Sequence, residues 1–122
     1  MQYLLLIHDA ESVWENMPEK QRNEIYGQYM AYTNELRDSG ALVGANQLQP
    51  TSTATTVRVR DGEQIVTDGP FAETKEQLGG YYLIEVDSVD EAIEWAAKIP
   101  SARLGSVEVR PVVPSRVEAS AG

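Results

Sequence analysis

The sequence predicts one α+β domain, an antiparallel sheet with two helices on one face. Three observations lead to this prediction. Short apolar or alternating segments typical of strands are interspersed with two longer segments of helical periodicity. Asp61-Gly62 lies between two β-prone runs, which is a strong hairpin signal. The chain has 122 residues and no cysteine, so one core must form without disulfides or thiolate-bound metals.

The first expected strand runs from Gln2 to His8 and reads QYLLLIH. Alternation places its odd-numbered residues on one face and its even-numbered residues, including His8, on the other. Both faces are apolar, so both should be covered. The next segment, Asp9 to Met17, contains Trp14 and fits either a short helix or a structured loop.

The longest expected helix runs from Pro18 to Ser39, with proline in the first turn and Gly40 at the end. Its apolar residues recur at spacings of four, three and four, which makes one buried stripe: Ile25, Tyr29, Tyr32 and Leu36.

The middle of the chain predicts strands. Residues 41–48 follow the Gly40 stop, residues 55–60 and 64–67 form the hairpin, and residues 79–86 form another apolar strand, GGYYLIEV.

A capping box, Ser88 with Glu91, opens the second helix. That helix should end at Pro100 and be followed by a last strand over residues 106–110. We expect its buried residues to be Ala92, Ile93, Ala96 and Ile99.

This order of elements is that of a ferredoxin-like plait with an inserted hairpin. We expect one domain over residues 1–113 and a flexible tail over 114–122, which is rich in Pro, Ser, Ala and Gly. Two helices cover only one face of such a sheet, yet the strands at 2–8 and 79–86 are apolar on both faces. A second copy of the chain is the simplest cover, so we expect a homodimer.

The charge balance is 10 Lys+Arg against 19 Asp+Glu, or −9 at pH 7. This acidic character repels phosphate backbones and anionic lipids, and the cations are scattered. We therefore expect no nucleic-acid partner and no membrane association. The longest apolar run is Leu4 to Ile7 and no basic leader precedes it, so we expect a cytoplasmic protein.

The run DGPFAETKEQLGGYYLIEV, from Asp68 to Val86, makes a connection longer than most in compact domains. It resembles the signature of the DGPF subgroup of YCII-related proteins, as do YLLLIH near the start, TATTVRVRDG at Thr53 to Gly62 and VEVRP at Val107 to Pro111. The resemblance implies a ferredoxin-like fold that dimerises as a dimeric α/β barrel. It also implies genes near extracytoplasmic-function sigma factors, and a His–Asp pair in a cleft as the catalytic candidate.

His8 and Asp68 are the catalytic candidates. His8 is the one histidine of the chain, and its ordinary pKa suits general acid–base chemistry near neutrality. The alternative is a strand-end histidine bonded to solvent or a loop. Asp68 would be its partner, or else a turn residue whose carboxylate accepts backbone N–H groups beside Gly69-Pro70.

The candidate ligand-binding residues are Tyr81, Tyr82, Lys75 and Trp14. The two tyrosines are adjacent in a strand, so one faces the helices and the other the opposite layer. Lys75 either binds an anionic substrate or is solvated, and Trp14 either roofs a pocket or fixes a loop to the core. We expect Phe71 to anchor its loop in the core.

We expect no metal and no cofactor. His8, Asp9 and Glu11 lie close in sequence, but one histidine beside loop carboxylates is a weak metal signal. Two functions remain open. One is a small cofactor-independent enzyme that transfers a proton on a small organic substrate. The other is a non-catalytic homodimer that binds a ligand or a protein, with a sigma-factor-related partner.

Overall fold

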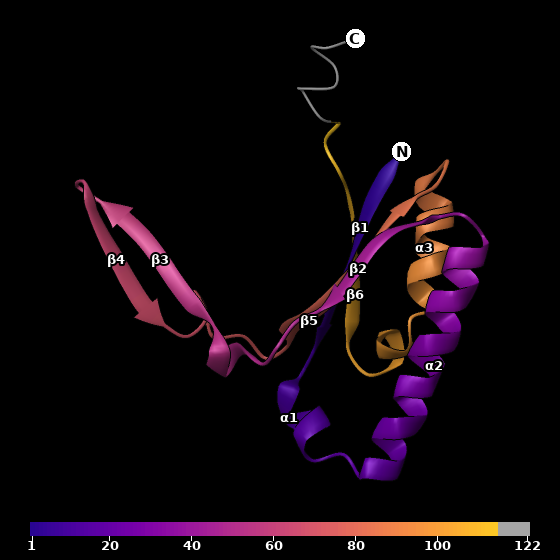
Figure 1. Ribbon diagram of the computed structural model, residues 1–122, viewed down its shortest axis with the longest axis horizontal. Helices are drawn as coiled ribbons and strands as arrows, with labels where there is room; N and C mark the ends of the chain where they lie inside the picture. The colour runs from indigo at the N-terminus through magenta and orange to yellow at the C-terminus, as the bar shows by residue number, and fades with distance from the viewer. Residues whose placement is uncertain (115–122) are drawn as a thin grey trace.

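The computed structural model describes residues 1–114, and four strands form its main sheet (Figure 1). They pair antiparallel in the order β2-β5-β1-β6, the ferredoxin-like order expected from the sequence. Their bounds are Gln2–Asp9 for β1, Leu42–Gln47 for β2, Gln77–Glu85 for β5 and Ser106–Pro111 for β6.

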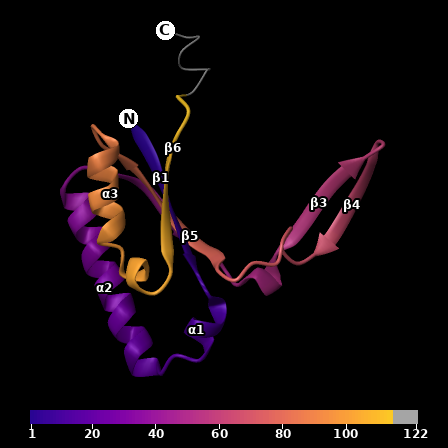
Figure 2. The same cartoon turned by 180° about the vertical axis from the view of Figure 1, so that it is seen from behind.

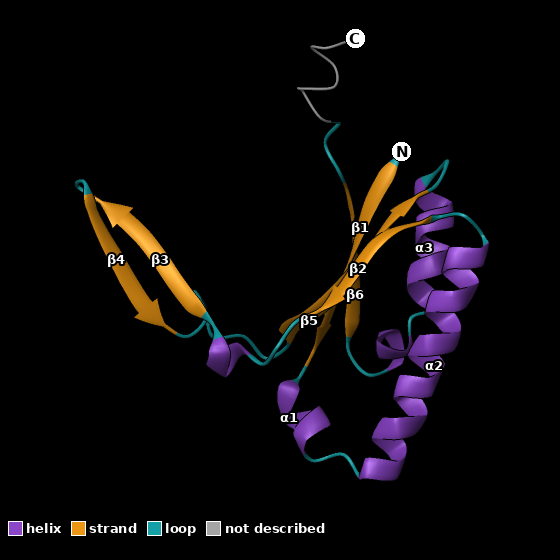
Figure 3. Ribbon diagram, viewed as in Figure 1, coloured by secondary structure: helices purple, strands orange, loops and turns teal. Residues whose placement is uncertain are grey.

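Two helices cover one face of this sheet, α2 (Glu19–Asp38) and α3 (Val89–Ala97) (Figure 3). Three short elements connect the larger ones: α1 (Glu11–Glu15), η1 (Thr51–Thr53) and η2 (Pro100–Arg103). The core lies between the helices and the sheet, and its fully buried large apolar residues are Leu5, Leu36, Ile84 and Ile99. We call the uncovered side of the sheet the open face.

The ends of the helices follow the chemistry of the sequence. The Ser88 hydroxyl accepts a hydrogen bond from the Glu91 N–H at 3.3 Å, which caps α3 as predicted. Gly40 follows α2 with a φ of +84°, a conformation that favours glycine. One burial prediction is wrong: Ile93 is 51% exposed, because it lies on the side of α3 that faces away from the sheet.

The hairpin forms, but it does not join the sheet. Strands β3 (Thr55–Arg60) and β4 (Glu63–Asp68) pair only with each other, across a turn in which both Asp61 and Gly62 have positive φ. This two-stranded arm leans away from the sheet on the side opposite the helices, as Figure 2 also shows.

No helix within residues 1–114 is long and apolar enough to cross a membrane. The tail predicted over 114–122 lies, apart from Pro114, outside the described residues.

Candidate functional site

A cavity of about 620 Å³ opens between the sheet and α2, on the helix side. Its walls come from the end of β1, from α1 and α2, from β2 and the segment after it, from β5 and from η2. Among the residues that line it are Asp9, Trp14, Arg22, Tyr26, Tyr29, Gly79, Gly80 and Ser101.

Asp9 is the last residue of β1 and is only 7% exposed. Strand alternation places its side chain on the face of Tyr3, Leu5 and Ile7, toward the helices. Within residues 1–114, its carboxylate accepts no hydrogen bond from the protein. Buried carboxylates are normally paired, so this acid at a cavity wall is free to act on a ligand.

Tyr29 faces the same cavity from α2, and its hydroxyl lies 2.5 Å from the Oγ of the fully buried Ser101. Burial raises the pKa of Tyr29 to about 12, and the negative charge of Asp9 adds to this rise. The hydroxyl therefore stays protonated near neutrality and can donate a hydrogen bond.

Arg22 lies in the first turns of α2, and its side chain reaches the cavity wall. One guanidinium nitrogen, Nη2, donates to the Met17 carbonyl at 3.0 Å. Nε is buried and has no partner among the described residues. A buried donor without a hydrogen bond is costly, and His8 Nε2 is the other buried side-chain atom of residues 1–114 in this state.

Two stacked aromatic rings, Trp14 and Tyr26, and the Glu11 carboxylate also line the cavity. Trp14 of α1 stacks on Tyr26 of α2, with ring centroids 5.8 Å apart and an interplanar angle of 21°. Glu11 accepts bonds from the Thr51 N–H at 2.7 Å and the Thr51 hydroxyl at 2.9 Å, which ties α1 to η1. Trp14 is among the residues that line the cavity.

Three glycines allow close backbone contacts: Gly79 and Gly80, which line the cavity, and Gly105 beside Asp9. The pairing of β1 with β5 shifts between Ile7 and His8, so Gly79 is an extra residue in β5, a β-bulge beside the site. A Cβ on Gly80 would lie 2.9 Å from the Asn46 carbonyl oxygen of β2. A Cβ on Gly105 would lie 2.3 Å from the His8 carbonyl oxygen and 2.8 Å from the Asp9 Cβ.

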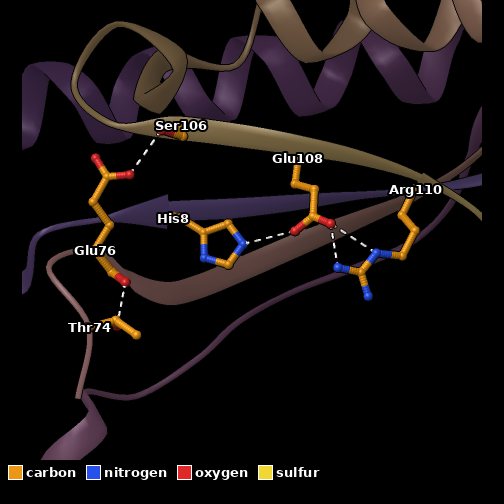
Figure 4. Close-up of polar contacts among 6 residues, drawn as sticks. All are labelled: His8, Thr74, Glu76, Ser106, Glu108 and Arg110. Carbon is orange, nitrogen blue, oxygen red and sulfur yellow. Dashed lines mark hydrogen bonds and ion pairs between the residues drawn. The ribbon is translucent and has the colours of Figure 1, made fainter. Parts of the chain in front are cut away.

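His8 lies on the open face, as its place in the alternation predicts, and not in the cavity (Figure 4). Its Nε2 is 3.5 Å from Glu108 Oε1 on the neighbouring strand β6. Arg110 binds the same carboxylate through two nitrogens, and this bonding is the main cause that lowers the pKa of Glu108. The charge of His8 lowers it further.

Asp68 ends the arm strand β4 and is exposed. Among residues 1–114, no ion pair or hydrogen bond joins it to His8. The sequence offered Asp68 as a partner of His8, but the arm that carries Asp68 leans away from the sheet (Figure 1). Register explains the actual partner, since Leu6 pairs with Glu108 and places that carboxylate diagonally from His8.

Of the other predicted residues, two tyrosines line the cavity, whereas Lys75 and Phe71 are exposed outside it. Tyr82 is buried toward the helices and bonds Thr33 Oγ1 at 2.7 Å, whereas Tyr81 accepts a bond from Asn46 Nδ2 at 2.8 Å. Both contribute to the lining of the cavity. Lys75 is exposed outside it. The expected core anchor, Phe71, is 81% exposed because its loop leaves the arm without packing on the core.

Sequence reasoning missed Asp9, Arg22 and Tyr29 as one group, although two signals pointed to them. Asp9 continues the buried face of the first strand, where a carboxylate is out of place. Arg22 lies three and seven residues before Ile25 and Tyr29, so it belongs to the apolar stripe of its helix.

The sequence of the chain matches a known protein family. The family model for the YCII-related domain matches residues 1–116. An uncharacterized protein of Rhizobium meliloti (strain 1021) is 40% identical over 114 residues, which is 92% of each chain.

One solved structure has a similar fold at low sequence identity. It is 5-chloro-2-hydroxyhydroquinone dehydrochlorinase from Burkholderia phenoliruptrix AC1100, in complex with 2,5-dihydroxybenzoquinone. The TM-score is 0.59 at 14% identity, over 96% of this chain and 98% of that one. The match to the domain model and the relative in Rhizobium meliloti together establish that this chain belongs to the YCII-related family.

Proposed function

We propose that the protein is a small enzyme that transfers a proton on a small organic molecule bound in the helix-side cavity. The observation that carries this proposal is Asp9, a 7% exposed carboxylate at the wall of a cavity of about 620 Å³, which accepts no hydrogen bond from residues 1–114. Apolar, partly enclosed cavities with a few polar groups are the usual form of small-molecule sites. A buried carboxylate in such a site is a natural general base.

The site residues divide the work. Asp9 takes a proton from an acidic C–H or O–H group of the substrate and returns it to another atom of the same molecule. Tyr29 carries its proton near neutrality, and burial raises its pKa further, to about 12, so the hydroxyl can donate a hydrogen bond to the oxygen where negative charge develops. The stacked rings of Trp14 and Tyr26 offer an aromatic wall that would hold a flat substrate.

The dehydrochlorinase of similar fold supports this substrate size and shape. Its complex contains a dihydroxybenzoquinone, a flat ring with several oxygen atoms. Such a ring would fit a cavity of about 620 Å³ with room for water. The proposal for this chain is limited to proton transfer and does not include loss of chloride.

The test is hydrogen–deuterium exchange at the ring carbons of 2-hydroxyhydroquinone in D₂O under nitrogen, followed by proton NMR. We expect the protein to accelerate exchange and Asp9→Asn to lose on the order of 10²-fold or more of this acceleration, the usual range for general acid–base catalysis. Asp68→Asn and His8→Gln are the matched controls and should keep the rate. Thermal melting of each variant checks the fold.

Two outcomes would contradict the proposal. If Asp9→Asn keeps the rate and His8→Gln or Asp68→Asn loses it, the open-face histidine or the arm carboxylate is the catalytic group. If the probe binds at the cavity and no variant or wild-type protein accelerates exchange, the non-catalytic ligand-binding function is the better interpretation.

Assembly as a homodimer is the second part of the proposal. Leu4, Leu6 and Leu83 are only half-buried on the open face. The arm has an apolar side as well: Val57, Val59 and Val66 lie on the same side of the hairpin and are 57%, 62% and 55% exposed. A two-stranded hairpin is marginal alone in water, so this side should be covered.

A second copy of the chain would cover both surfaces. The arm extends on the open-face side of the sheet, so a partner packed on that face would lie beside the arm (Figures 1 and 2). This arrangement is the sheet-to-sheet dimer, the dimeric α/β barrel, that the sequence resemblance implied. The DGPF subgroup, a cytoplasmic location and a sigma-factor-related partner stay predictions from the sequence.

A further inference from the structure

The Arg22 guanidinium holds an unneutralised positive charge at the cavity. It is the one Arg or Lys among the described residues that line the cavity. None of the ion pairs within residues 1–114 includes it, although Asp9, Glu11 and Glu15 line the same space. Burying or half-burying an unpaired charge costs free energy, and a bound anion would offset this cost.

The guanidinium is also free to meet such a partner. Within the described part of the chain it makes one hydrogen bond, from Nη2 to the Met17 carbonyl, and Nε has no partner. An anion with two acceptor oxygens could accept bonds from Nε and from a second guanidinium nitrogen together. A fork of two parallel N–H donors matches a carboxylate or another delocalised oxyanion.

The carboxylates nearby limit where an anion can bind. Glu11 is already engaged by two bonds from Thr51, and Asp9 lies at the β1 end of the cavity. An anion would therefore bind at the Arg22 end and keep its uncharged part toward Asp9. The aromatic pair Trp14 and Tyr26 lies on the same wall as Arg22, since Tyr26 is one helical turn further along α2.

We propose that the cavity selects a small planar organic anion, whose carboxylate or enolate oxygens bind Arg22 while its unsaturated frame lies against Trp14 and Tyr26. This inference rests on the proposed function and names its substrate class. It assigns Arg22 as the group that recognises the charge. It also gives the substrate one orientation, with the reacting atom directed to Asp9.

Binding of benzoate, followed by calorimetry, tests the charge, and benzamide is the neutral probe of the same shape. We expect benzoate to bind at least about tenfold more tightly than benzamide, as a charge-assisted bond predicts. Arg22→Gln should remove this preference, and Arg22→Lys should keep part of it. Arg103→Gln is the matched control, because Arg103 donates to Gln28 and does not line the cavity.

Cyclohexanecarboxylate tests the planar frame, and we expect it to bind more weakly than benzoate. The inference is wrong if benzoate and benzamide bind equally, if neither binds, or if Arg22→Gln keeps the preference while its melting temperature is unchanged. If Arg22→Gln does not fold, a reduced preference for benzoate over benzamide in the folded Arg22→Lys protein supports the inference, and an unchanged preference contradicts it.

The two proposals fail separately. If benzoate selectivity depends on Arg22 but Asp9→Asn keeps hydrogen–deuterium exchange, the anion site stands and the catalytic role of Asp9 does not. If exchange depends on Asp9 but benzoate selectivity does not depend on Arg22, the enzyme stands and the substrate class is wrong.

Discussion

The bond between Tyr29 and Ser101 offers a thermodynamic test of the cavity wall. Tyr29→Phe removes the hydroxyl that lies 2.5 Å from Ser101 Oγ, and Ser101 is 0% exposed. The 0% exposed Ser101 hydroxyl then loses its tyrosine partner. Leaving a buried polar group unsatisfied costs about 1–3 kcal/mol, so we expect the free energy of unfolding to fall by that amount.

Ser101→Ala should cost less, about 0.5–1.5 kcal/mol, because the Tyr29 hydroxyl borders the cavity and water can reach it there. The double variant removes both polar groups and should cost hardly more than Tyr29→Phe alone. The two changes should therefore couple by about 1 kcal/mol, a value typical of groups in direct contact.

Urea denaturation of the four proteins measures this coupling, and Tyr26→Phe is the control. Tyr26 is 42% exposed and its hydroxyl has no hydrogen bond within the described chain, so its loss should change stability by less than about 0.5 kcal/mol. Additive costs for Tyr29→Phe and Ser101→Ala would refute the reasoning, because they would show that the two hydroxyls do not depend on each other.

Three further predictions follow from burial, close contact and exposure. Burial raises the pKa of Tyr29 from 10.0 to about 12, so between these pH values the folded protein holds a proton that the unfolded chain has lost, and the free energy of unfolding should fall as pH rises. Denaturation followed by circular dichroism should show a smaller fall in Tyr29→Phe, and an equal fall would contradict this prediction. Gly105→Ala should destabilise the protein by about 1–3 kcal/mol, because its Cβ meets the backbone of His8 and Asp9. Gly27→Ala in α2, where a Cβ has nothing within 4 Å, should stabilise it by up to about 1 kcal/mol, and equal effects of the two changes in urea denaturation would contradict this prediction. Light scattering at micromolar concentration should give the mass of a dimer, and Leu6→Glu on the open face should give a monomer; a monomeric wild-type protein would exclude the homodimer.

Local patterns in the sequence were sufficient for the six strands, the two longer helices and their order, but they left residues 9–17 open between a short helix and a loop. Asp61-Gly62 predicted the hairpin turn because both positions need positive φ, and Ser88 predicted the start of α3 because its hydroxyl can accept an N–H bond three residues on. Such signals act within a few residues, so these two turns and caps form without depending on contacts with distant segments.

Relations between distant segments were harder to predict. The hairpin of β3 and β4 forms an arm outside the sheet, and no local sequence pattern indicates which strands pair with which. Phe71 follows this arm, so its exposure could not be predicted either. The cavity joins Asp9 to Arg22 and Tyr29 of another element, so it required the packing of α2 on the sheet. The sequence directed attention to His8 because it is the one histidine, yet β6 gives that residue Glu108 as its neighbour.

The location of the ligand site can be measured directly, because the chain has one tryptophan at the cavity and one away from it. Trp14 lines the cavity, whereas Trp95 of α3 packs on Tyr32. In ¹H–¹⁵N NMR titration with 2-hydroxyhydroquinone under nitrogen, the Trp14 indole N–H and the Gly80 amide should shift, and the Trp95 indole should not. Shifts confined to Trp95 or to the open face around Glu108, with Trp14 unchanged, would contradict a functional site in the helix-side cavity.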